Sequence, residues 1–139
     1  MVTTTTSYEG DLHCTIMHAP SGAAFATDAP KDNQGKGESF SPTDLVGAAL
    51  GSCILTTMAI VAKPLGIELS GATASVIKEM AAAPDRRIAS LTVQINVPGN
   101  VPTEHRERLE SAAHRCPVHK SLHPDIAIPI TFAWGEAAA

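Results

Sequence analysis

The chain has 139 residues, a formal net charge of −4, and only one Trp, one Tyr and three Phe. This length predicts a single domain over residues 1–139, with a modest core of aliphatic and small side chains. The acidic balance, without a basic cluster, argues against nucleic-acid binding. The first residues, MVTTTTSYEG, lack the basic and apolar regions of a secretory signal, so the expected compartment is the cytoplasm.

The first forty residues predict two strands and a loop. Residues 12–16 alternate between apolar and polar side chains, a pattern typical of a half-buried strand. Ser21 and Gly22 predict a turn into a second strand over residues 23–27. Residues 28–38, DAPKDNQGKGE, are rich in charge and turn formers and predict a surface loop.

The central segment, residues 45–62, contains no charged residue and predicts a long helix. Ser41, Pro42 and Asp44 suit an N-cap, a first helical residue and the reciprocal acid of a capping box, and Pro64 ends the segment. A helix that is apolar on nearly every side is expected to be buried all round. Its length also reaches the lower limit for a membrane span, but its Gly, Ala, Ser and Thr content and the lack of an aromatic belt favour a core helix.

The second half predicts a hairpin, a helix and a last strand. Residues 69–80 and 88–97 alternate as strands around the turn AAAPDRR. A second helix is predicted from residue 102 to Arg115 or Cys116, where Pro117 ends it. The last strand covers residues 127–134, and the short tail after it is not expected to be ordered. The fold class is therefore α+β, with a largely antiparallel sheet around one long buried central helix.

A second copy of the chain is the expected partner of this helix. The helix is strongly apolar, and few bulky side chains elsewhere in the chain can cover it. Packing against a second copy would bury its apolar surface and stabilise it. An obligate homodimer is the expected assembly.

The three cysteines differ in their settings. A reducing compartment favours reduced, catalytic or packed cysteines over a structural disulfide framework. Cys14, on an alternating strand, is expected to be merely packed. Cys53 lies near the midpoint of the apolar helix, a setting suited to protected redox chemistry. Cys116 is predicted at a helix C-terminus, where the dipole disfavours a thiolate, so it is expected to be the weaker nucleophile.

Two motifs carry a family resemblance. The stretch FSPTDLVGAALGSC, followed sixty-three residues later by CPVHKSL, resembles the OsmC/Ohr family of osmotically inducible and organic-hydroperoxide-resistance proteins. The resemblance implies an intertwined homodimer, in which two sheets enclose the paired central helices, with two active sites at the interface.

The resemblance also implies a thiol peroxidase of oxidative-stress defence that needs no cofactor. The family cysteine that matches Cys53 attacks an alkyl or lipid-like hydroperoxide and becomes a sulfenic acid. The cysteine that matches Cys116 resolves it as a disulfide, which a dithiol of the lipoyl type reduces. This division of roles agrees with thiol chemistry, since a sulfenic acid condenses readily with a nearby thiol.

One family feature is missing. The family activates its thiolate with an Arg from the N-terminal strands, held by a Glu ten residues before the cysteine; here that position is Thr43, and no Arg precedes Arg86. Another cation is needed, because burial alone makes a thiol sluggish. The candidates are His18, Lys36, Arg115, His119 and Lys120, with Glu38 or Asp44 as orienting acids. Among them His119, whose imidazole titrates near neutral pH, is the favoured partner of the cysteine pair.

Two further interpretations remain open. A family dimer without the Arg and Glu would be non-catalytic and bind an apolar small molecule at its interface pocket. A metal-binding module would use His114, Cys116, His119 and His123, but their spacing matches no standard four-ligand pattern, so no metal is expected. For the peroxidase, Leu50, Ile54 and Met58 are expected to form an apolar channel above Cys53 that favours organic peroxides.

Overall fold

A computed structural model describes residues 1–135; residues 136–139, which hold most of the predicted tail, lie outside the described residues. The chain divides into two compact units, Met1–Val46 and a second unit that begins at Gly47. The boundary falls inside the central helix, α1 (Pro42–Ala62). The first turn of α1 therefore belongs to the N-terminal unit and the rest to the C-terminal unit.

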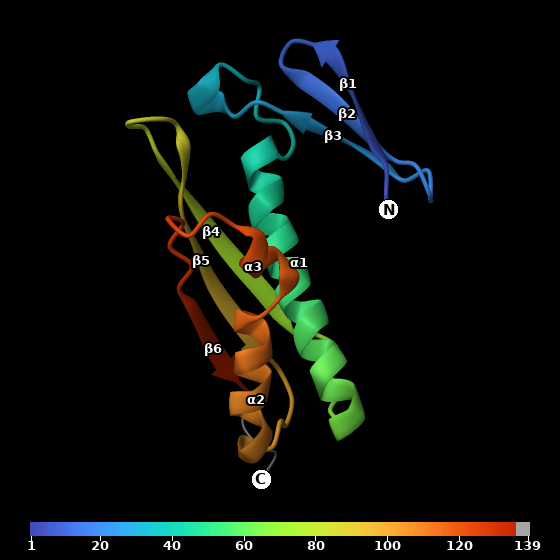
Figure 1. The fold of residues 1–139 in the computed structure, drawn as a ribbon, viewed down its shortest axis with the longest axis vertical. Coiled ribbons are helices and arrows are strands. Elements are labelled where there is room, and N and C mark those ends of the chain that lie inside the picture. Colours follow the sequence, from blue (N-terminus) through green and yellow to red (C-terminus); the bar gives the residue numbers. More distant parts are fainter. Residues whose placement is uncertain (136–139) are drawn as a thin grey trace. The chain divides into compact units, whose positions relative to one another are not determined.

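The N-terminal unit is built on an antiparallel three-stranded sheet in the order β1-β2-β3 (Figure 1). Its strands are β1 (Thr4–Gly10), β2 (His13–His18) and β3 (Ala24–Asp28). The two predicted strands are confirmed as β2 and β3. Strand β1 was not predicted because its residues, TTTSYEG, show no apolar alternation, although threonine favours extended backbone.

The predicted surface loop connects β3 to α1 and contains one short 3-10 turn, Lys31–Asn33. Its ends are tied by backbone hydrogen bonds, from Asp28 N to the Phe40 carbonyl oxygen at 3.0 Å and from Ala29 N to the Leu12 carbonyl oxygen at 3.1 Å. Gly35 is required by a close approach, because a Cβ atom there would lie 1.7 Å from the Ala29 carbonyl oxygen. The loop is thus held in a defined path.

The helix α1 begins and ends as predicted. The Ser41 Oγ accepts from the Asp44 N–H at 3.1 Å, and the Asp44 carboxylate accepts from the Ser41 N–H at 2.9 Å, which completes the capping box. After Ala62 the chain makes a 3-10 turn, Lys63–Leu65, and leaves it at Gly66, which has a left-handed φ of 71°.

The C-terminal unit contains a second three-stranded sheet in the order β4-β5-β6. Its strands are β4 (Thr73–Ala81), β5 (Arg87–Val97) and β6 (Ile130–Trp134). The predicted hairpin is confirmed, since β4 and β5 pair antiparallel. Strand β6 pairs parallel to β5, with Val93 opposite Ile130, because the chain returns to the sheet through two helices rather than a tight turn.

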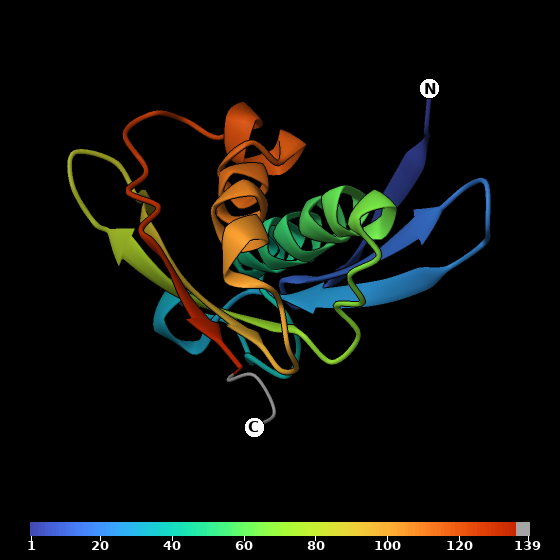
Figure 2. The same ribbon diagram turned by 90° about the horizontal axis from the view of Figure 1, so that it is seen from below.

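The connection before β6 holds α2 (Thr103–His114) and the short α3 (Pro117–Ser121). The predicted second helix is confirmed as α2, which buries Leu109, Ala112 and Ala113 along one side. Figure 2 shows α2 and the C-terminal part of α1 on the same face of the β4-β5-β6 sheet. The helix α3 was not predicted, because Pro117 ends α2 and also occupies the first position of a new helix.

Small residues let α1 approach the sheet closely. A Cβ atom on Gly51 would lie 3.4 Å from the Val76 Cγ2 and 3.5 Å from the Ala74 Cβ, and one on Gly47 would lie 3.5 Å from the Val76 Cγ1. The buried residues of α1 share one stripe: Gly47, Leu50, Gly51, Ile54, Met58 and Ala62. This stripe forms the core together with the inward side chains of β5, Leu91, Val93, Ile95 and Val97.

The opposite face of α1 is exposed to solvent in the single chain. The expectation that the helix is buried on all sides is therefore wrong for one chain taken alone. This outer face of α1 comprises the exposed residues Ala48, Ala49, Ser52, Thr56, Ala59 and Ile60. By length and composition the segment Pro42–Leu65 could cross a membrane, with 33% of its most apolar window buried. In this structure the buried stripe packs against the sheet, as in a core helix.

Candidate thiol site

Cys53 lies in the middle of α1, and its side chain is half-buried. Its sulfur has the hydroxyl of Thr57 as a neighbour, with 3.9 Å between Sγ and Oγ1. The two residues are one turn apart, so their side chains share a face of the helix. Sequence reasoning missed Thr57, although its spacing of four residues from Cys53 was a usable signal.

Cys116 lies between two helices and is fully buried. It follows α2, as predicted, but it is also the N-cap of α3, with φ −61° and ψ 144°. Its sulfur accepts a hydrogen bond from the His119 N–H, with 3.3 Å between N and Sγ. The expectation that a helix C-terminus governs this thiol is therefore wrong, because the nearest backbone groups are the N–H groups of α3.

The structure brings the two sequence-predicted cysteines together, and both are free thiols. Burial raises the pKa of Cys116 most strongly, and the Cys53 thiol, through a side-chain hydrogen bond and charge repulsion, raises it further. The N–H groups of His119 and Val118 act in the opposite direction, without reversing the shift. Cys116 is thus held protonated beside Cys53.

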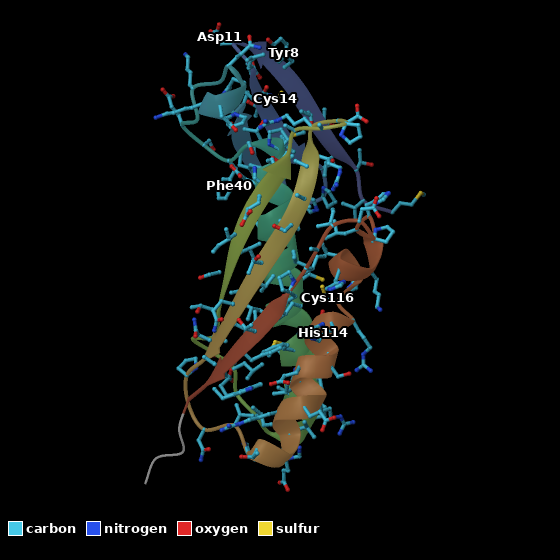
Figure 3. All side chains as sticks on the ribbon, turned by 90° about the vertical axis from the view of Figure 1, so that its left-hand side faces the viewer. Tyr8, Asp11, Cys14, Phe40, His114 and Cys116 are labelled. Carbon is cyan, nitrogen blue, oxygen red and sulfur yellow. The ribbon has the colours of Figure 1, made fainter. Side chains whose placement is uncertain are left out.

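His119 lies next to this pair through its backbone. Its imidazole ring makes an edge-to-face contact with His114, with 6.3 Å between ring centroids, and His114 contacts Phe132 in the same way at 6.4 Å. Figure 3 shows His114 and Cys116 close together where α2 gives way to α3. The favoured partner His119 is therefore at the site, and its N–H rather than its imidazole is the group that touches sulfur.

Three of the other predicted activating or orienting residues, His18, Glu38 and Asp44, lie in the N-terminal unit and have partners there. His18 Nδ1 contacts Ser21 Oγ at 2.6 Å in the hairpin turn between β2 and β3. Asp44 serves the capping box of α1. The N–H of Glu38 donates to the buried Asp28 carboxylate at 3.0 Å. Each of these three residues thus has a local structural partner.

Asp28 is the centre of a polar cluster that the sequence did not predict. Its carboxylate meets His13 Nδ1 at 2.5 Å, and a pocket of about 270 Å³ beside it is also lined by Lys36 and Glu38. The hydrogen bond from His13 holds the pKa of Asp28 below its usual value, helped by the Glu38 N–H and the charge of Lys36. Its stabilising effect is present above the ordinary pKa of an aspartate and is lost as the pH falls through the lowered value.

The remaining candidates, Arg115 and Lys120, flank Cys116 along the chain and are exposed. Within residues 1–135, the polar contacts of the Cys53 sulfur are with Thr57 and Cys116, neither of which carries a positive charge. No group of three or more His, Cys, Asp or Glu residues in that same range is placed to hold a metal ion.

The predicted apolar channel above Cys53 is wrong in its residues. Leu50, Ile54 and Met58 have no exposed surface, because they belong to the buried stripe of α1. They line the core rather than a path to the thiol.

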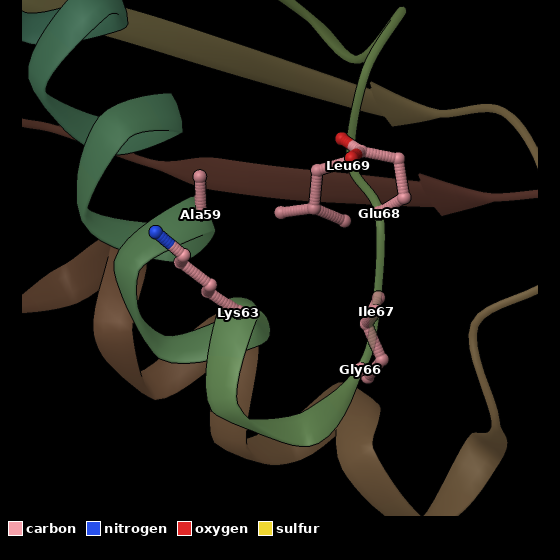
Figure 4. Close-up of a pocket in the computed structure, with 6 residues that line it drawn as sticks. All are labelled: Ala59, Lys63, Gly66, Ile67, Glu68 and Leu69. Atoms are coloured by element: carbon pink, nitrogen blue, oxygen red, sulfur yellow. The ribbon is translucent and has the colours of Figure 1, made fainter.

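A surface pocket of about 400 Å³ lies at the C-terminal end of α1 (Figure 4). Ala59 and Lys63 line one side, and residues 66–69 of the connection to β4 line the other. A neighbouring pocket of about 330 Å³ shares Ala59, Glu68 and Leu69 with it. Neither cysteine of the pair lines either pocket, so these hollows are separate from the thiol site.

The family of the chain follows from comparison with known proteins. The family described as OsmC-like protein matches residues 35–131, which include α1, both cysteines of the pair and most of the second sheet. The chain belongs to this OsmC-like family.

Solved structures share the fold over nearly the whole chain. A protein of Psychrobacter arcticus, named for osmotic stress induction and a detoxification response, is 41% identical, with a TM-score of 0.90 and 96% of each chain covered. An OsmC organic hydroperoxide resistance protein of Legionella pneumophila is 14% identical, with a TM-score of 0.78 and 96% of each chain covered. The organic hydroperoxide resistance protein OhrB of Bacillus subtilis is 19% identical, with a TM-score of 0.68, and 96% of this chain and 98% of that chain are covered. No curated protein matches the sequence significantly.

Proposed function

We propose that the protein is a thiol peroxidase that reduces organic hydroperoxides, acting in oxidative-stress defence in the cytoplasm. The observation that carries the proposal is the meeting of two free thiols, Cys53 and Cys116, from separate elements of the fold. Relatives named for organic hydroperoxide resistance have the same fold and support this chemistry. The proposal needs no cofactor.

The proposed cycle has three balanced steps. The Cys53 thiolate attacks the distal oxygen of ROOH; the O–O bond breaks, and RO⁻ leaves and takes a proton to become ROH, while Cys53 becomes a sulfenic acid. The Cys116 thiol then condenses with that sulfenic acid to give a disulfide and water. A dithiol, of the lipoyl type in this proposal, returns both cysteines to thiols and is itself oxidised to a disulfide.

The assignment of roles follows from the two environments. Cys116 is fully buried and its pKa is raised, so it is the poorer source of an attacking thiolate and is assigned to the second step, in which the sulfenic acid is already beside it. Cys53 is the less buried of the two and is suited to meet the substrate. The proposed roles, with Cys53 attacking and Cys116 resolving, are thus supported by the difference in burial and not by a helix dipole.

A crosslink between the two cysteines tests the proposal. After brief exposure of the reduced protein to one equivalent of cumene hydroperoxide, we expect digestion and mass spectrometry to yield a Cys53–Cys116 disulfide-linked peptide pair. A dithiol should reverse it. Cys14, on β2, serves as the internal control and should remain a thiol. A protein in which oxidation goes to sulfinic acid at Cys53 without any such peptide pair would contradict the cycle.

The rival function, binding of an apolar small molecule, draws support from the adjoining pockets beside Ala59 and Leu69. In that case the cysteine pair would be inert and the crosslink would not form. The same mass-spectrometric experiment therefore separates the two functions.

We also propose that the protein is a homodimer. The outer face of α1 is uncharged and exposed in one chain, with Ile60 67% exposed, and a second copy offers matching surface for it. Light scattering on the eluting protein should then give twice the chain mass of 14.4 kDa. Ile60→Glu places a charge on this face and should shift the mass toward one chain, whereas Lys78→Glu, on β4, should not. A wild-type mass of one chain would contradict the dimer.

A further inference from the structure

We infer that Thr57 is a catalytic residue of the thiol site, whose hydroxyl donates a hydrogen bond to the Cys53 thiolate and stabilises it before it attacks the peroxide. This inference deepens the proposed function and rests on it for its chemical consequence. It adds a residue that neither the sequence motifs nor the cysteine pair alone identify.

The position of Cys53 creates the need for such a donor. The residue lies in the interior of a long helix, where backbone N–H groups are committed to carbonyl oxygens one turn earlier. Both ends of α1, where free N–H groups or carbonyl groups remain, are several turns away, and the His119 N–H at the start of α3 is bonded to Cys116 instead. A half-buried thiolate at this point therefore depends on side chains for its hydrogen bonds.

Thr57 is the side chain placed to donate. Its Oγ1 lies 3.9 Å from the Cys53 Sγ, from the next turn of the same helix face. Side chains four residues apart in a helix are neighbours on its surface, so α1 presents the Thr57 hydroxyl to the Cys53 side chain. The regular geometry of the helix therefore brings the hydroxyl within hydrogen-bond range of the sulfur.

A thiolate has no proton to donate, so the Thr57 hydroxyl is the donor to the Cys53 thiolate, and Cys116 is a second neighbour of the same sulfur. Burial raises the pKa of Cys116, so this group remains an S–H and is a donor toward Cys53. The Cys116 sulfur already accepts the His119 N–H. Cys53 thus has two donors around it, Thr57 O–H and Cys116 S–H, and is the sulfur of the pair that is suited to carry the negative charge.

In the first step, this hydrogen bond lowers the free energy of the Cys53 thiolate and holds its lone pairs in a fixed orientation. The sulfur then attacks the distal peroxide oxygen, the O–O bond breaks, and the departing RO⁻ takes a proton from water to leave as ROH. The Thr57 hydroxyl can rotate afterwards to accept from the sulfenic S–O–H, since a hydroxyl both donates and accepts. No atom of Thr57 is transferred.

The test is the pH dependence of Cys53 alkylation in Thr57→Val, which keeps the side-chain shape and removes the hydroxyl. We expect the midpoint of iodoacetamide labelling, followed on the Cys53 peptide by mass spectrometry, to move upward by about 0.5 to 1 pH unit, as loss of one modest hydrogen bond implies. Labelling at pH 7 should fall by about threefold to tenfold. Thr57→Ser keeps the donor and should follow the wild-type curve.

A purely structural role of Thr57 would lower the melting temperature without moving the labelling midpoint. Thr57→Ala is the second variant if the valine form does not fold, and the same shift is expected for it. Superimposable curves for wild type, valine and serine forms would overturn the inference. The outcome is distinguishable from failure of the proposed function, because alkylation needs no peroxide: a shifted curve without a crosslink removes the peroxidase cycle and leaves the hydrogen bond established.

Discussion

Cys53→Ser is expected to reduce the rate of hydroperoxide consumption to the uncatalysed background, a loss of at least about a thousandfold, because a serine oxygen is not ionised at neutral pH and is a poor nucleophile toward an O–O bond. The measurement is steady-state turnover of cumene hydroperoxide with dihydrolipoamide as the dithiol. The substitution replaces one atom in a half-buried position, so the fold should be retained.

Cys116→Ser is the matched variant, and the structure explains the choice. Serine can accept the His119 N–H as an N-cap in place of the thiol, whereas alanine would leave α3 without its cap. The serine form should still consume one equivalent of peroxide, since Cys53 is intact, but it should not continue with the dithiol at the wild-type rate. Two outcomes would contradict the assignment: full turnover by Cys53→Ser, or a single-turnover burst that depends on Cys116 alone.

Gly51→Leu is expected to give the largest loss of stability, because α1 contacts β4 through this glycine. Beyond the Cβ position, which already lies 3.4 Å from the Val76 Cγ2, there is no room for further carbon atoms without moving the helix off the sheet. Overpacking of this kind lowers the free energy of unfolding by about 2 to 3 kcal/mol, or more where the backbone must shift. Thermal unfolding should show a melting temperature lower by about 5 to 10 °C.

Gly47→Ala is the control for this prediction. A Cβ atom there meets Val76 and Leu91 at 3.5 and 3.6 Å, which is ordinary van der Waals contact. Since alanine is favoured over glycine in a helix by about 1 kcal/mol, the free energy of unfolding should stay the same or rise slightly. A Gly51→Leu protein as stable as wild type would mean that α1 does not rest on β4 as described.

Local signals in the sequence were enough to predict α1. An uncharged run, a capping box at Ser41 and Asp44, and a proline after the last turn fix its bounds without tertiary information. The hairpin of β4 and β5 was also predictable, but β4 begins at Thr73 rather than at residue 69. The Ala72 N–H bonds to the Leu69 carbonyl oxygen and Gly71 has a φ of 90°, so residues 69–72 form a turn instead.

The start and the direction of β6 were harder to predict from the sequence. Residues 127–129 lie beside β5 and accept hydrogen bonds from Leu91 and Val93, but Pro129 has no N–H to return, so the regular ladder begins at Ile130. That β6 runs parallel to β5 depends on the path of the whole crossover through α2 and α3, which no local pattern contains.

The candidate site was predictable only in its two cysteines, through their motifs. The cap on Cys116 and the hydroxyl beside Cys53 depend on side-chain geometry, and the sequence offered spacing but no means of choosing among many polar residues. His119 illustrates the point: its imidazole was the expected functional group, but its backbone N–H is what reaches the sulfur. The same holds for Glu38, which meets Asp28 through its own N–H.

The backbone anchor of Cys116 bears on how fast two distant parts of a chain can react. A cysteine on a loose loop must search for its partner, and each encounter is limited by the freedom of the loop. Here the sulfur is already immobilised by a peptide group, at a site that adjoins Cys53 before any oxidant arrives. The fold therefore orients the two sulfur atoms before the reaction. Disulfide formation between them then resembles an intramolecular reaction with a high effective concentration.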